Sequence, residues 1–527
     1  MSGFRQIETC VAGEGMVASA DDRAAQAGVA ALAKGGNAID AAISAGVMAA
    51  VTLPHMSGLG GDLFAIVHRE GEPPIVLNAS GRAPTGADPA KLRGEGYDCI
   101  PLRDDLRSVT VPGCVDGWTM LHERFGRLAL SELLEPAQKV AQDGFRAQPE
   151  LFAASRDVLD IAGAEAFSGI TSPESLVRTP GVARDLLSIM EQGRQGFYAG
   201  AFGRDLVEMS EGLFTSADLE AVHGDWVSPL RIRAFDHDIW AVPPNSPGYI
   251  VLDAAWLSQR IGLPNDITDP AWPHLLIEAV RQASFDRRAV LYQDSDGAAL
   301  ISEERLRPRL ENIQTRRSTT LGGTYVSGDT TYLCVVDGER TAVSLIQSLA
   351  KPFGSHLFMQ GHDSVLNNRG VSFSLEQGHP AELRLGRRPP HTLAPLLVTR
   401  PDGKLQTILG TMGGDIQPQV LLQLLVRTLV LRESPACSLA AARWALSSEN
   451  TTGFDTWDDG LAAVRVLLES DCPEPWVNGL VERGHQVEVL EPLANRFGHA
   501  ALISVLGDAL AGASDPRAAS SGVRGYN

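Results

Sequence analysis

A pair of threonines is the feature best suited to chemistry. It lies in Gly328-Asp329-Thr330-Thr331, where the residue pattern changes from mostly helix-like to strand-like. A threonine hydroxyl is a weak nucleophile unless a base accepts its proton, and the chain has no GxSxG segment that would indicate a serine triad. A cut before Thr330 would supply the base, because a free α-amino group has a pKa of about 7.7–8.0 and lies beside its own hydroxyl.

These residue types therefore indicate a precursor that cleaves itself between Asp329 and Thr330, with Thr330 as the nucleophile. Cleavage requires Thr330 Oγ to attack the preceding carbonyl carbon, followed by hydrolysis of the resulting ester. Thr331 is an adjacent alternative cut site. The plain alternative is that Thr330 only begins a strand, since strands are rich in threonine.

A serine on the following strand-like run is placed to support that nucleophile. The runs 331–336 and 342–348 flank Asp337-Gly338, a pair typical of hairpin turns. If the turn centres on Gly338 and Glu339, Thr330 faces Gln347 and lies diagonal to Ser348. We therefore expect Ser348 to hydrogen-bond to Thr330.

A glycine pair further along the chain could stabilise an anion. Gly413 and Gly414 follow a strand-like run and precede a helix-like run that has Pro418 in its first turn. Adjacent glycines leave backbone N–H groups open at a helix N-terminus, whose dipole favours negative charge. The pair is a candidate oxyanion hole for acyl transfer, and a tight strand-to-helix turn is the alternative.

The first hundred residues predict two buried helices followed by two strands. Asp21-Asp22 and Asn37 are expected to cap alanine-rich helices that run through Lys34 and from Ala38 to Val51. Strands are expected at 63–67 and 75–77. The glycines of Ser57–Asp62 lead into a strand rather than a helix and no P-loop lysine follows, so a phosphate site is disfavoured.

Beyond this region the elements predict a mixed sheet covered by helices. Residues 110–315 are mostly helix-like, and after residue 329 strand pairs alternate with helices. The expected elements are a helix at His274–Arg288, strands at 396–399, 405–409, 500–505 and 509–511, and helices at Gln419–Arg432 and Leu439–Ala445. The boundary near 329 has no linker composition, so we expect two pieces of one core.

Composition excludes several classes of protein. The chain has 527 residues, of which 44% are hydrophobic and 21% charged, as in a globular protein, and its net charge of −19 disfavours nucleic-acid partners. Six scattered cysteines without a CxxC spacing disfavour a zinc ribbon and a disulfide framework. No apolar run reaches the ~18 residues of a membrane span, and none near residue 1 resembles a signal peptide. We expect a cytoplasmic protein without a membrane partner.

Several segments occur together in an order that identifies a family resemblance. They are Gly35–Ala42, Pro54–Gly61, Val111-Pro112-Gly113, Phe285-Asp286-Arg287, Thr330–Asp337 and Met412-Gly413-Gly414. With Ser514–Arg517 near the end, they resemble the gamma-glutamyltranspeptidase family of N-terminal-nucleophile hydrolases. The resemblance implies a four-layer αββα sandwich formed jointly by a large subunit, 1–329, and a small subunit, 330–527.

The resemblance also implies roles for individual residues. Thr330 would be both nucleophile and base, Ser348 the hydroxyl that supports it, and Gly413 with Gly414 the oxyanion hole. Neither a metal nor a cofactor is implied. The partners are a small-molecule amide, the two subunits themselves and a homo-oligomer of the heterodimer.

The positions at which this family binds its substrate differ in the present sequence. Ser80 stands where the family has an arginine, with Arg82 two residues later, and Ala350 replaces an asparagine. Ser372 replaces the acid that holds the substrate amine, and Arg369 is added. A buried ammonium group without a countercharge would cost several kcal/mol. These changes favour a substrate with a carboxylate and no α-amine.

Together with the Pro243–Ser246 segment, these features resemble the branch that contains oxamate amidohydrolase and transpeptidase-like acylases. They predict hydrolysis of a small, oxamate-like amide through an acyl-threonine intermediate. The expected substrate-binding residues are Arg82, Arg369, Ser372, His391 and Thr392. Arg369 as a solvated loop charge and His391 as a packed histidine are the alternatives at these positions. For the whole protein, a gamma-glutamyl hydrolase or transferase and an unprocessed, inactive binding homologue stay open.

Overall fold

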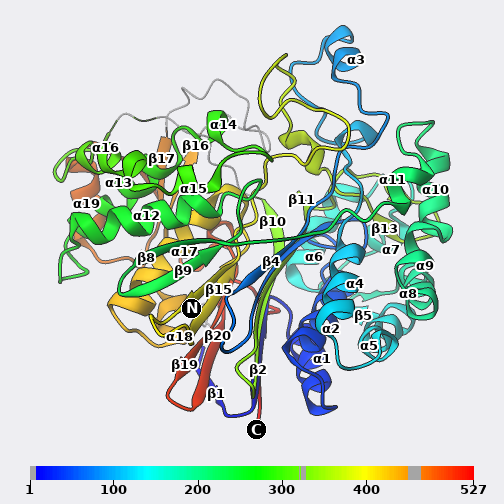
Figure 1. Cartoon of the computed structure of the whole chain (residues 1–527), viewed down its shortest axis with the longest axis horizontal. Helices are drawn as coiled ribbons and strands as arrows, with labels where there is room; N and C mark the ends of the chain where they lie inside the picture. Colours follow the sequence, from blue (N-terminus) through cyan, green and yellow to red (C-terminus); the bar gives the residue numbers. More distant parts are fainter. Residues whose placement is uncertain (1–6, 320, 322–327, 449–463) are drawn as a thin grey trace.

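Two antiparallel seven-stranded sheets form the centre of the molecule (Figure 1). The computed structural model describes residues 7–319, 321, 328–448 and 464–527. Sheet I has the order β21 (Gly522–Tyr526), β2 (Gly15–Ser19), β10 (Asp329–Asp337), β11 (Ala342–Ala350), β3 (Asp62–His68), β4 (Ile75–Ala79) and β7 (Asp225–Val227). Sheet II has the order β1 (Cys10–Ala12), β20 (Ala509–Ser514), β19 (Ala500–Leu506), β15 (Leu405–Thr411), β14 (Leu396–Thr399), β9 (His237–Ala241) and β8 (Leu230–Ala234).

Alternation along the central strands gives each sheet two apolar faces. On β10, Tyr332 and Cys334 belong to the apolar cluster between the sheets, together with Ile408 of β15. Their neighbours Leu333 and Val335 belong to the cluster on the opposite face of sheet I. Successive strand residues point to opposite faces, so both faces of sheet I are covered. The four-layer αββα fold expected from the sequence is confirmed.

Helices cover the outer face of each sheet (Figure 1). On sheet I lie α1 (Asp22–Ala33), α2 (Ala38–Thr52) and α4 (Cys114–Phe125), with α5 (Leu130–Asp143) packed against α2. On sheet II lie α12 (Gly248–Ile261) and α17 (Gln417–Leu425), with α13 (Ala271–Ser284) packed against both. Small side chains let α1 and α2 pack closely, and a capping box from Asn37 to Asp40 fixes the start of α2.

Shorter elements complete the layers. The other helices are α3 (Pro89–Gly94), α6 (Pro149–Ala154), α7 (Glu165–Ser168), α8 (Pro180–Gln192), α9 (Arg194–Tyr198), α10 (Ala201–Met209), α11 (Ser216–Glu220), α14 (Arg287–Val290), α15 (Gly297–Leu300), α16 (Glu303–Glu311), α18 (Pro435–Ala440) and α19 (Pro475–Glu482). A small sheet joins β16 (Trp444–Ser448), β17 (Val464–Glu469) and β18 (Gln486–Leu490), and two-residue strands form the pairs β5 (Phe145–Arg146) with β6 (Leu176–Val177) and β12 (Phe358–Met359) with β13 (Ser364–Val365). No described helix has the length and apolar character needed to cross a membrane.

The predicted hairpins and the two N-terminal helices are confirmed, and two expected helix ends are wrong. The helix expected at 439–445 ends at Ala440, because Trp444 begins β16 and pairs with β17. The helix expected at 274–288 ends at Ser284, and the side chain of Asp286 beyond it binds Arg305 instead. The region 110–315 is mostly helical, as expected, and also contributes β7, β8 and β9 to the two large sheets.

Candidate active site

Thr330, Ser348 and Asp62 form a row across three neighbouring strands of sheet I. Ser348 of β11 lies opposite Asp62 of β3, so both side chains point to the same face. That face is the inner one, because Ile346 and Phe64, two residues away on the same strands, pack between the sheets. Thr330 of β10 donates a hydrogen bond from Oγ1 to Ser348 Oγ at 3.3 Å. All three side chains are almost completely buried.

A β-bulge in β11 lies opposite Thr330 and brings Ser348 to it. Asp329 lies opposite Ala350 whereas Thr331 lies opposite Gln347, so two residues of β11, Ser348 and Leu349, face the single residue Thr330 at the shift in register. Bulges frequently redirect a side chain next to a functional site. Thr330 is the second residue of β10, directly after Asp329.

The predicted register of this hairpin is wrong by one residue, although the expected hydrogen bond is present. Gln347 lies opposite Thr331 rather than Thr330. The turn is longer than a two-residue turn, because Asp337 N–H donates to the carbonyl of Thr341 and Arg340 adopts a φ of 61°. Asp337 Oδ1 also accepts hydrogen bonds from the backbone N–H groups of Glu339 and Thr341, which stabilises this longer turn.

Arg369 lies beside this row and is fully buried, so it is not a solvated loop charge. It begins the short 3₁₀ helix η3 (Arg369–Ser372). Its Nε donates to Asp62 Oδ2 at 3.0 Å, its Nη2 to Ser348 Oγ at 3.2 Å and its Nη1 to Thr392 Oγ1 at 3.3 Å. Burial lowers the pKa of Arg369, and the negative charge of Asp62 opposes that effect.

His391 completes the group as a neutral hydrogen-bond donor. Its Nδ1 accepts hydrogen bonds from the backbone N–H groups of Thr392 and Leu393, so the ring proton belongs on Nε2. Nε2 lies 2.9 Å from Asp62 Oδ2, to which it donates. Burial and the charge of Arg369 lower the pKa of His391 to about 4. Burial raises the pKa of Asp62, but Arg369 and His391 outweigh this and hold it below its usual value.

The Gly413-Gly414 turn closes the same end of the sandwich from sheet II. Both residues have positive φ, 126° and 61°, which glycine adopts without strain. A Cβ at Gly410 would lie 2.1 Å from the ring of Tyr332, so the end of β15 packs directly over the start of β10. Asp415 follows the turn, forms an ion pair with Arg287 and acts electrostatically on Arg369. The turn that contains the predicted oxyanion-hole residues is therefore close enough to Arg369 for its neighbour Asp415 to act on that guanidinium.

The remaining predicted residues divide into two groups. Thr392 contacts Arg369, and Ser372 is buried at the end of η3. Arg82 lies elsewhere, since its guanidinium pairs with Asp225 of β7 at 2.7 Å and donates to the carbonyl of Gly386. The sequence reasoning missed Asp62, whose signal was its position directly after Gly60-Gly61 at the start of a strand.

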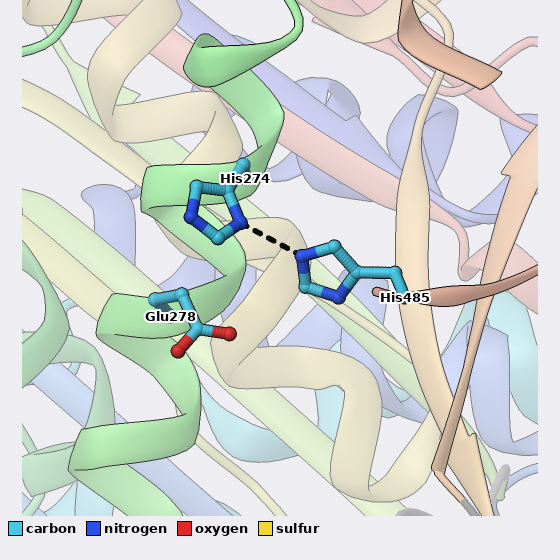
Figure 2. Close-up of side chains that lie close together, drawn as sticks. All are labelled: His274, Glu278 and His485. Atoms are coloured by element: carbon cyan, nitrogen blue, oxygen red, sulfur yellow. Dashed lines mark hydrogen bonds between the residues drawn. The ribbon is translucent and has the colours of Figure 1, made fainter. Parts of the chain in front are cut away.

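Among the described residues, one group of side chains of metal-ligating types lies together, away from this site (Figure 2). His274 and Glu278 of α13 and His485 are buried, and their ligand atoms lie within 4.8 Å of one another. His274 Nε2 donates to the carbonyl of Gln314 at 2.7 Å, and the two imidazoles share a hydrogen bond of 2.8 Å. The Arg281 guanidinium lies 3.9 Å from Glu278 and disfavours an added cation. We infer that these three side chains hold residues 314–319 against α13.

This histidine pair predicts a loss of stability in mild acid. Burial lowers the pKa of His274 to about 4 and that of His485 to about 3, whereas an unfolded histidine titrates near 6.5. The unfolded chain therefore binds protons first, and the free energy of unfolding falls as the pH drops below about 6.5, by up to about 1.4 kcal/mol per pH unit for each histidine. In His485→Gln, Tm should fall less between about pH 7.5 and about pH 5.8 than in the parent chain. An equal fall in both chains would contradict the assignment.

Known proteins are similar to this chain in sequence and in fold over nearly its whole length. A sequence profile described as Gamma-glutamyltranspeptidase matches residues 24–524. The glutathione hydrolase-like YwrD proenzyme of Bacillus subtilis is 32% identical, with 95% of this chain and 97% of that protein aligned. The oxamate amidohydrolase proenzyme of Klebsiella pneumoniae is 31% identical over 96% and 98% of the two chains. The cephalosporin acylase of Bacillus halodurans superposes with a TM-score of 0.88 at 28% identity, covering 100% of this chain and 98% of that one.

Proposed function

Because this chain belongs to the gamma-glutamyltranspeptidase family of hydrolases, we propose that it is a self-processing amidohydrolase with Thr330 as its nucleophile. The observation that carries the proposal is the contact of Thr330 Oγ1 with Ser348, which Arg369 also contacts, on the inner face of sheet I. The hydroxyl is buried, hydrogen-bonded and close to a fixed positive charge. A nucleophilic threonine that forms an alkoxide fits these surroundings better than a threonine with only a structural role.

Processing would proceed by an acyl shift within the chain. Thr330 Oγ attacks the carbonyl carbon of Asp329, the C–N bond of the peptide breaks, and the nitrogen keeps its pair of electrons and gains the hydroxyl proton. Water then hydrolyses the ester, which releases a carboxylate at Asp329 and the α-amine of Thr330. Ser348 is positioned to hold Oγ1 for this attack.

The two segments produced by this cut would stay associated. In sheet I, β10 lies between β2 and β11, and β11 lies between β10 and β3. β2 and β3 belong to residues 1–329, whereas β11 and nearly all of β10 belong to residues 330–527. Separation would break ladder hydrogen bonds on both sides of the β10–β11 hairpin, so a large and a small subunit would form one body.

Turnover would use the same atoms on an external amide. The α-amine of Thr330 accepts the hydroxyl proton as Oγ1 attacks the substrate carbonyl, and it returns that proton to the leaving amine. The backbone N–H groups of Gly413 and Gly414 are candidates to stabilise the oxyanion. Water then hydrolyses the acyl-threonine ester and releases the carboxylic acid.

The proposed substrate is a short amide whose acyl part carries a carboxylate. Arg369 is a buried guanidinium next to Ser348, and a guanidinium binds a carboxylate through paired hydrogen bonds. The position expected to hold an acid for a substrate amine is Ser372, which carries no charge. Oxamate meets both conditions, and glutaryl or succinyl amides are longer versions of it.

Turnover of three substrates tests this proposal. The purified, processed protein should hydrolyse oxamate or a glutaryl amide with a higher kcat/KM than a gamma-glutamyl anilide. The physical reason is that the α-ammonium of the gamma-glutamyl group would meet the positive charge of Arg369, whereas Ser372 carries no charge to hold it. The highest kcat/KM for the gamma-glutamyl compound would instead establish a gamma-glutamyl hydrolase or transferase.

A further inference from the structure

We infer that Asp62 is a positioning residue of this site, which holds Arg369 against Ser348 and thereby sets the preference for an acyl carboxylate. The inference deepens the proposed function and rests on it. Asp62 contacts Arg369 directly and would act on the substrate through that arginine.

The position of Asp62 is fixed from the backbone outward. It is the first residue of β3 and pairs with Ser348 across the β3–β11 ladder. The strand pairing therefore fixes its carboxylate on the inner face of the sheet, next to the Ser348 hydroxyl that contacts Thr330. One oxygen, Oδ2, accepts from Arg369 Nε at 3.0 Å and from His391 Nε2 at 2.9 Å.

Because Asp62 binds Arg369 at Nε, the two Nη groups of the guanidinium lie on the side that faces Ser348 and Thr392. Nη2 donates to Ser348 and Nη1 to Thr392, at 3.2 and 3.3 Å, which is longer than the 3.0 Å contact with Asp62. Contacts of that length are weaker than the charged contact, so a substrate carboxylate can compete for the Nη hydrogens. Asp62 would thus hold the arginine by the side that the substrate does not use.

The surroundings of Asp62 favour a functional role over a stabilising one. Its second oxygen, Oδ1, is buried and has no hydrogen-bond partner among the described residues. A buried carboxylate with one oxygen unsatisfied is an inefficient source of stability, since burying a charge costs more than imperfect pairing returns. A role in orienting Arg369 explains why the carboxylate is present there.

The test compares a charged substrate with its uncharged match in Asp62→Asn. Oxamate and oxamide differ only in the group that Arg369 would bind, and glutaramate with glutaramide repeats the comparison for a longer acyl group. Asp62→Asn should lower kcat/KM for the carboxylate amide about tenfold, mainly through KM, and change that of the diamide less than about threefold. Asp238→Asn, which removes a carboxylate paired with Arg233 in sheet II, is the matched control and should leave the ratio unchanged.

A double-mutant cycle shows whether Asp62 acts through Arg369. In an Arg369→Met background, Asp62→Asn should change the oxamate-to-oxamide ratio less than about twofold. If Asp62→Asn alone fails to fold, Asp62→Asn combined with Arg369→Gln removes both charges, and its oxamate-to-oxamide ratio should equal that of Arg369→Gln alone within about twofold. Equal losses for both substrates, or independent effects in the cycle, would overturn the inference. A wild type that hydrolyses no carboxylate amide would overturn the proposed function instead.

Discussion

Replacing Thr330 with alanine is expected to leave one uncut chain of 56 kDa and to reduce amide hydrolysis about a thousandfold or more. Alanine has no oxygen to attack the carbonyl of Asp329, so neither the ester nor the α-amine can form. The wild type should give two bands, near two thirds and one third of the full mass, on denaturing electrophoresis. N-terminal sequencing of the smaller band should begin at Thr330.

The neighbouring threonine provides the matched control for this prediction. Thr331 is buried, and its side chain faces away from the inner surface because it follows Thr330 on the same strand. Thr331→Ala should therefore be processed at the same bond as the wild type. A wild-type chain that stays uncut after purification would contradict self-processing and would support the inactive binding homologue. A small chain that begins at Thr331 would move the nucleophile by one residue.

The strand pairs and the buried N-terminal helices were predictable because their signals are local. Alternating apolar residues around Asp337-Gly338 and the capping residues Asp21 and Asn37 are enough to define β10, β11, α1 and α2. The exact register was not predictable, because a left-handed Arg340 lengthens the turn and a bulge in β11 opposite Thr330 shifts the ladder again. The two shifts place Thr330 beside Ser348. The register predicted from the sequence, with Thr330 opposite Gln347, led to the same expected contact.

The surroundings of the nucleophile were only partly predictable. Arg369 and Thr392 were expected near the substrate from their positions in the sequence, and the structure places them in contact with each other. Asp62 and Arg82 show the limit of that reasoning. Asp62 reaches the site through pairing between strands far apart in the sequence, and Arg82 is drawn to Asp225 of β7, a strand that sequence patterns did not predict.

Arg369→Lys is expected to lower kcat/KM for the carboxylate amide about thirtyfold or more, which corresponds to about 2 kcal/mol. Lysine keeps a positive charge opposite the buried Asp62, so the chain should still fold and process itself. A single ammonium group cannot reach Asp62, Ser348 and a substrate carboxylate together, whereas the three nitrogens of arginine are directed to separate partners. Steady-state kinetics with oxamate and oxamide measure the effect.

Arg82→Lys is the control that separates the two candidate anchors. Its guanidinium pairs with Asp225 outside the Thr330 group, so this variant should change kcat/KM for oxamate less than about twofold. A larger loss in Arg82→Lys than in Arg369→Lys would transfer the anchoring role to Arg82. If oxamide lost as much as oxamate in Arg369→Lys, the arginine would support Ser348 and the nucleophile rather than the substrate carboxylate, because only oxamate carries the charge that the guanidinium would bind.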